Sequence, residues 1–88
     1  MRVELRGTIR AALGTTALEV DLPAGGVPLS QLLDAIAAAN PRARTYLGPM
    51  SGEAVLRPVH NGTLVPPGED PLVQADDQVL LIHAVAGG

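Results

Sequence analysis

The chain has 88 residues, which is enough for one domain with a single modest core and too short for two. It contains no cysteine, which excludes disulfides, thiolate nucleophiles and iron–sulfur ligation, and its one aromatic residue, Tyr46, leaves little for stacking on nucleobases. The net charge of −3 and the lack of a basic run along any segment argue against nucleic acid and favour a protein partner with a basic face.

The apolar pattern argues against a membrane protein. No apolar run reaches the roughly 18 residues that span a bilayer. Charges at Arg2 and Glu4 stand where a signal peptide needs its apolar region. We therefore expect a soluble, cytoplasmic protein that binds neither membrane nor nucleic acid.

The N-terminal segment predicts two strands. Val3 and Leu5 alternate with charged residues, and a second alternating run covers residues 18–22. Gly7, or the stretch that begins at Gly14, supplies a turn between them. We therefore expect an N-terminal hairpin.

A helix is predicted from about Leu29 to the Asn40-Pro41 pair. Apolar residues recur at the spacing of one helical face, namely Leu29, Leu32, Leu33, Ile36 and Ala37. A proline pushes the residue before it out of the α region, so Asn40 ends the helix. Residues 41–53 predict an irregular connection with a short helical turn at 42–47.

A second hairpin is predicted in the C-terminal half. Residues 54–60 form its first strand, and Asn61-Gly62 is the strongest short hairpin signal because both turn positions need positive φ. Residues 63–65 return as a short strand. The prolines at 66–67 place this strand at an edge, since proline cannot donate to a ladder.

The near-continuous apolar run at 79–82 predicts a central closing strand. The order of elements then packs one main helix on one face of a mixed sheet of four to five strands, an α+β fold of the β-grasp or ubiquitin-like type. We expect this domain to cover residues 1–84. A flexible tail follows, made of Val85, Ala86, Gly87 and Gly88.

The Gly87-Gly88 ending is the strongest functional feature. Because glycine has no Cβ, a paired-glycine tail can lie extended in a narrow catalytic channel and present its terminal carboxylate there. The alternative is a terminal extension without a function. All six basic residues are arginines, a composition that follows from GC-rich coding or from a need to exclude amines that attack a reactive acyl group.

Three stretches resemble those of the ubiquitin-like sulfur carrier proteins, and the resemblance covers essentially the whole chain. They are Val59-His60-Asn61-Gly62-Thr63, then Pro71-Leu72 with Ala75-Asp76-Asp77-Gln78-Val79, and finally Ala84-Val85-Ala86-Gly87-Gly88. This family includes the small subunit of molybdopterin synthase and the thiamine-pathway sulfur carrier. The resemblance implies that ATP activates the Gly88 carboxylate to an acyl-adenylate on a separate E1-like adenylating enzyme. A sulfur donor then converts it to a thiocarboxylate.

The resemblance also implies the partners. They are the adenylating enzyme, which uses the ATP, and a synthase that accepts the sulfur. The chain itself would be a carrier without a bound cofactor rather than an enzyme, although it can serve as the small subunit of a sulfurtransferase complex. The short single-domain form and the long connection from helix to strand favour the molybdopterin type.

Members of this family dock through an exposed apolar sheet face. The resemblance places Leu80 and Ile82 on that face, with His83 beside them as a partner contact, and Val79 and Leu81 in the core. Strand parity supports this split but does not decide which set faces inward. Burial of both sets in the core stays an alternative.

Other functions remain open from the residues alone. His60 and His83 lack a third ligand of clear spacing, so we predict no metal site. A ubiquitin-like modifier, joined through Gly88 to a lysine of a target, would use the same adenylation. A β-grasp interaction domain would use neither glycine of the tail.

Overall fold

The computed structural model describes residues 1–47, 54–66 and 68–85. Its elements, in chain order, are β1 (Arg2–Gly7), α1 (Thr8–Leu13), β2 (Ala17–Glu19), β3 (Val27–Pro28), α2 (Leu29–Ala39), the 3-10 turn η1 (Pro41–Ala43), α3 (Arg44–Leu47), β4 (Ala54–His60), β5 (Thr63–Leu64), β6 (Leu72–Val73) and β7 (Val79–Val85).

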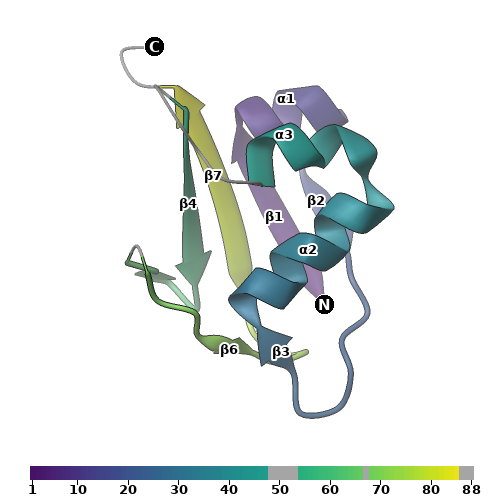
Figure 1. Cartoon of the computed structure of the whole chain (residues 1–88), viewed down its shortest axis with the longest axis vertical. Helices are drawn as coiled ribbons and strands as arrows, with labels where there is room; N and C mark the ends of the chain where they lie inside the picture. The colour runs from purple at the N-terminus through teal and green to yellow at the C-terminus, as the bar shows by residue number, and fades with distance from the viewer. Residues whose placement is uncertain (48–53, 67, 86–88) are drawn as a thin grey trace.

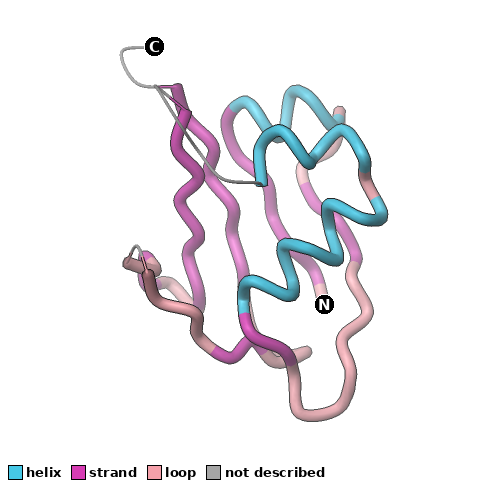
Figure 2. Tube along the Cα trace, in the orientation of Figure 1, coloured by secondary structure: helices cyan, strands magenta, loops and turns pink. Residues whose placement is uncertain are grey.

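The main sheet has five strands in the order β2-β1-β7-β4-β5. The last strand, β7, lies at its centre, parallel to β1 and antiparallel to β4. The helices lie together on one side of the sheet, as Figures 1 and 2 show. This is the predicted β-grasp, with β7 central and the short β5 at an edge.

The core lies between the sheet and α2, and it is aliphatic. Its buried apolar residues are Val3, Leu5, Ile9, Leu29, Leu32, Ile36, Ala43, Val73, Val79 and Leu81. The predicted helical face supplies three of them, from Leu29 to Ile36. Burial of these side chains supplies the main stabilising free energy, at about 25 cal/mol per Å² of apolar surface.

The start of α2 is fixed by a residue from a distant loop. Pro28 precedes the helix and has no side chain that caps it. Instead, the Asp70 carboxylate accepts hydrogen bonds from the Ser30 N–H at 2.7 Å and from the Ser30 hydroxyl at 2.6 Å. These bonds lower the pKa of Asp70, and they hold the segment before β6 against the helix.

The connection between the first two strands differs from the prediction. β1 and β2 do pair antiparallel, but the helix α1 joins them, and the second strand ends at Glu19. Ile9 of α1 is fully buried, and Gly14 ends the helix in the left-handed conformation. A short helix therefore forms here in place of the predicted tight turn, because the helix buries an apolar side chain in the core.

The Asn61-Gly62 turn and the short helical segment are confirmed, the strand after the turn is one residue shorter than predicted, and residues 48–53 of the predicted irregular connection lie outside the described residues. The turn between β4 and β5 has Asn61 and Gly62 at positive φ, and η1 with α3 forms the helical segment expected near residues 42–47. The unpredicted addition is a small sheet in which β3 pairs antiparallel with β6. The sequence could not predict these strands, because two residues are too few to show an alternating apolar pattern.

The closing strand extends to Val85, so the strand includes one residue that the sequence assigned to the tail. The rest of the predicted flexible tail, residues 86–88, lies outside the described residues. Within the part of the chain that the structure describes, no helix is both long and apolar enough to cross a membrane.

Candidate functional site at the base of the tail

The sheet register holds β7 from both sides as far as His83. His83 lies opposite Gly7 of β1 and opposite Leu56 of β4. Beyond His83, β1 has ended, and β4 alone pairs with Ala84 and Val85. The strand that precedes the terminal glycines is therefore held in the sheet as far as Val85, the last of the described residues.

Gly7 is the point where β1 turns away from β7 into α1. Its φ of 79° and ψ of −145° lie in a region that favours glycine. A Cβ at this position would lie 2.1 Å from the backbone carbonyl oxygen of His83. Glycine is needed here both for its conformation and for the close approach of the two chains.

Thr8, the next residue, bonds to the same part of β7. Its hydroxyl donates to the His83 carbonyl oxygen at 3.0 Å and also contacts the Nδ1 of the His83 ring. A hydroxyl has one proton, so both contacts are satisfied when that proton goes to the carbonyl and Nδ1–H donates to the hydroxyl oxygen. The start of α1 thereby fixes both the backbone and the ring of His83.

The His83 ring is buried beneath the helices. It is 3% exposed and forms a T-shaped pair with the Tyr46 ring, with the ring centroids 4.8 Å apart. Its Nε2 is buried and has no hydrogen-bond partner among the described residues. Burial lowers the pKa of His83 below its usual value, so the ring is held neutral at physiological pH.

This placement corrects the prediction for His83. The sequence grouped it with Leu80 and Ile82 on a partner face, but strand alternation puts it on the buried face with Val79 and Leu81. Leu80 and Ile82 point the other way and are half-buried. The split between the two pairs is as predicted, and the outer face of β7 thus offers an apolar strip.

Two arginines flank this strip near the tail. Ile82 lies opposite Arg6 of β1 and opposite Arg57 of β4, so the three side chains share one row of the sheet. Both arginines are exposed. Leu80 lies in the next row away from the tail, between Glu4 and Val59.

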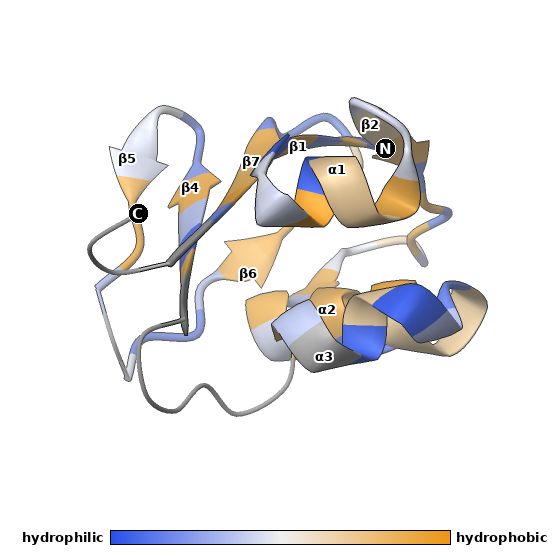
Figure 3. Cartoon of the chain, turned by 90° about the horizontal axis from the view of Figure 1, so that it is seen from above, coloured by the Kyte–Doolittle hydropathy of each residue, from blue (hydrophilic) through white to orange (hydrophobic). Residues whose placement is uncertain are grey.

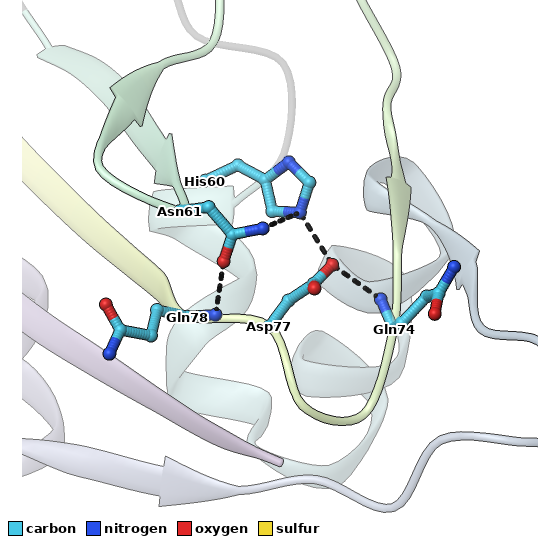
Figure 4. Close-up of polar contacts among 5 residues, drawn as sticks. All are labelled: His60, Asn61, Gln74, Asp77 and Gln78. Carbon is cyan, nitrogen blue, oxygen red and sulfur yellow. Dashed lines mark hydrogen bonds and ion pairs between the residues drawn. The ribbon is translucent and has the colours of Figure 1, made fainter.

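The far end of β7 begins at a polar cluster, which Figure 4 shows. The Asp77 carboxylate lies 2.8 Å from the His60 ring and accepts a hydrogen bond of 2.9 Å from the Gln74 N–H. These two contacts, that from Gln74 first, lower the pKa of Asp77. Asn61 joins the cluster by accepting a bond from the Gln78 N–H at 2.8 Å. The cluster ties the β4–β5 turn to the turn before β7.

The two histidines lie at opposite ends of the sheet and form no pair. His60 stands opposite Val79, whereas His83 stands opposite Leu56. Residues 1–47, 54–66 and 68–85 contain no group of three or more His, Asp or Glu side chains placed to hold a metal ion. The predicted reactive group, at Gly88, lies outside the described residues, as do Ala86 and Gly87.

The roles of Gly7 and Thr8 at this site were not predicted from the sequence. A signal for them was present, since Ile9, Ala12 and Leu13 have helical spacing and Gly14 follows as a C-terminal cap. The contact of Thr8 with β7 depends on the parallel pairing of β1 with β7, which local patterns do not specify.

The fold and the tail define the class of this protein as ubiquitin-like: a β-grasp domain whose central strand leads to a C-terminal diglycine. The ThiS family model matches residues 3–88. The chain belongs to the ThiS family, and it is a ubiquitin-like sulfur carrier or modifier.

Solved structures show the same fold at low sequence identity. The crystal structure of SAMP1 from Haloferax volcanii has a TM-score of 0.75 and 23% identity, with coverage of 99% of this chain and 97% of that one. The crystal structure of H. volcanii small archaeal modifier protein 1 has a TM-score of 0.68 and 20% identity, with coverage of 92% of each chain. No curated protein matches the sequence.

Proposed function

We propose that this protein is a sulfur carrier whose reactive group is the carboxylate of Gly88. The observation that carries the proposal is the ThiS family match, which runs through residue 88 and so includes the terminal diglycine. The base of the tail supports it, because Gly7 and Thr8 fix β7 at His83, just before the tail.

The chemistry takes place on partner enzymes. An oxygen of the Gly88 carboxylate attacks the α-phosphorus of ATP on an E1-like adenylating enzyme, and pyrophosphate leaves. A sulfide equivalent then attacks the carbonyl carbon of the acyl-adenylate, the bond from that carbon to the AMP oxygen breaks, and AMP leaves. Adenylation is needed because a carboxylate is a poor acyl electrophile until its oxygen becomes part of a good leaving group.

The direct test is intact mass spectrometry after incubation with an adenylating enzyme, ATP and sulfide. We expect a mass change equal to one oxygen replaced by one sulfur, located at Gly88 and absent without ATP. A chain lengthened by one alanine after Gly88 is the matched control, because its folded domain is unchanged and its terminal carboxylate is displaced. Equal sulfur loading of the lengthened chain would overturn the proposal.

We assign the sulfur to the molybdopterin pathway. The long connection between α2 and β4, which holds η1 and α3, supports this assignment. The test supplies the sulfur-loaded protein to the large subunit of molybdopterin synthase and, separately, to thiazole synthase. Turnover by the thiazole enzyme alone would move the protein to the thiamine pathway.

A second candidate function is protein modification. The similarity to H. volcanii small archaeal modifier protein 1 favours it. The same acyl-adenylate would then end as an amide bond between Gly88 and a lysine of a target. Covalent conjugates of higher mass on blots of tagged protein, lost when Gly88 is deleted, would support this function.

A further inference from the structure

We propose that the tail end of this molecule is a basic docking surface that fits a protein partner with acidic side chains around an apolar centre. The partner is the adenylating enzyme that receives the tail, so this inference rests on the proposed function. We call the surface the tail-end basic surface. It is formed by Arg6, Arg10, Arg42, Arg44 and Arg57.

The first part of the surface is the row of the sheet nearest the tail. Arg6 and Arg57 stand on either side of Ile82, on strands that flank β7. Neighbouring strands lie about 4.8 Å apart, so the two arginines are separated by about 10 Å across the apolar strip. Both are exposed, and neither forms an ion pair within the described part of the chain.

The second part comes from the helical layer at the same end. Arg10 lies on α1, Arg42 on η1 and Arg44 on α3, and all three are exposed. α1 contacts both β7 and η1, while α3 contacts η1 and β4. Figure 1 shows α1 and α3 beside the end of β7 from which the tail leaves, and Figure 3 views the molecule from this end. Arginines thus occur on the sheet and on the helical layer at this end of the molecule, with Arg42 on the β2 side, where it lines a hollow with Leu13 and Leu18.

Four of the nine acidic residues lie at the other end of the molecule. Asp76 and Asp77 lie in the turn that precedes β7, and Glu69 and Asp70 lie in the segment that leads to β6. The two ends of β7 therefore carry opposite charges close by, with Arg6 and Arg57 at one end and Asp76 and Asp77 at the other, although the net charge is −3. The net charge predicts a partner with a basic face, but the arrangement of charges indicates an acidic partner at the end that carries the tail.

The kind of partner follows from the neighbours of the arginines. Ile82 lies between Arg6 and Arg57, and Leu80 continues the apolar strip in the next row, between Glu4 and Val59. An apolar strip matches the centre of a protein interface and has no counterpart on a phosphate backbone. At physiological salt, charges interact over about 8 Å, so local complementarity outweighs the repulsion between a distant acidic end and an acidic partner.

The test compares two charge reversals on the same strand. Arg6→Glu changes the tail-end basic surface, and Arg2→Glu makes the same change in charge at the far end of β1, where Arg2 is exposed and lies opposite Glu19. We measure kcat/KM for each protein as substrate of the adenylating enzyme by ATP–pyrophosphate exchange, at low and at high salt. Arg57→Glu provides a second variant on the other side of Ile82, and circular dichroism checks that each variant is folded.

We expect Arg6→Glu and Arg57→Glu to lower kcat/KM about tenfold at low salt, mainly through KM, and to lose most of that effect at high salt. Arg2→Glu should stay within about twofold of the unchanged protein. Equal effects of Arg6→Glu and Arg2→Glu would overturn the docking surface and leave the proposed function intact. If the unchanged protein supports no ATP–pyrophosphate exchange, that result would instead contradict the proposed function and the choice of the adenylating enzyme as the partner. Loss of binding to a single-stranded RNA oligomer in Arg6→Glu, with exchange unaffected, would also overturn the proposal in favour of nucleic acid.

Discussion

The central strand β7 begins and ends in different surroundings. At its start, the cluster of His60 and Asp77 is held by polar contacts, with the two side chains 18% and 19% exposed. At its end, His83 is buried, neutral and bonded to Thr8, and Gly7 packs directly against its backbone. The side chains at the start are partly exposed, so water can replace a lost partner there, whereas the buried His83 would be left without one when its contact is broken, which is costly. We infer that substitutions at the His83 end of β7 destabilise the fold more than substitutions at its start.

The largest effect is expected at Gly7. Gly7→Ala places a Cβ against the His83 carbonyl at positive φ, and we expect it to lower the free energy of unfolding by about 3 kcal/mol or more. Gly14→Ala is the matched control, because Gly14 also has positive φ but an added methyl group there would meet no atom within 4 Å. It should cost about 1 kcal/mol. Urea denaturation measures both, and equal losses would contradict the close packing at the end of β7.

A smaller loss is expected when the Thr8 hydroxyl is removed. Thr8→Val keeps the shape of the side chain but leaves the His83 carbonyl and ring without their partner, and it should cost about 1–2 kcal/mol. Thr15→Val removes a hydroxyl that bonds locally to Ala17 and serves as the control. If thermal denaturation shows that the Thr15 variant loses more, then the Thr8 contact is not what holds β7.

A further change is expected on mild acidification. The pKa of His83 is lowered in the folded state, so the unfolded chain takes up a proton more readily than the folded one. The stability from this neutral ring is complete above pH 6.5 and falls as the pH drops below that value. His83→Leu should lose this dependence when urea unfolding is followed from pH 7.5 to pH 5.5. If the pH dependence is unchanged in the variant, then a group other than His83 causes it.

The smallest effect is expected at the opposite end. Asp77→Asn keeps the shape of the side chain but removes the charge that faces His60, and we expect a loss smaller than that for Thr8→Val. The pKa of Asp77 is lowered in the folded state, so its contribution is present above pH 3.8 and is lost as the pH falls through the folded-state value. Denaturation in high salt should reduce the difference further. A loss larger than that for Thr8→Val would reverse the comparison between the two ends.

The sequence predicted the elements with strong local signals. The helical face from Leu29 to Ile36, the Asn61-Gly62 turn and the central β7 are confirmed. It did not predict α1, because the helical spacing of Ile9, Ala12 and Leu13 covers little more than one turn, and the glycines on either side of the helix also fit a turn. Likewise, parity could not decide which face of β7 is buried, and burial of His83 depends on the helices that cover it.

The candidate site was predicted in part. The apolar strip of Leu80 and Ile82 follows from strand alternation, whereas the row of Arg6, Ile82 and Arg57 joins residues far apart in the sequence. No segment of the chain is basic by itself, so composition indicated no basic surface. The sheet register creates this surface, and only the tertiary structure specifies that register.

The central claim is that Gly88 carries sulfur, and intact mass spectrometry of the protein purified from its own cells tests it most directly. The purification omits reducing thiols and amines that would react with a thiocarboxylate. We expect a fraction of molecules in which sulfur replaces one oxygen at Gly88, and we expect that fraction to disappear when the adenylating enzyme is deleted. An unmodified carboxylate in every molecule, under conditions that require the sulfur-containing product, would contradict it.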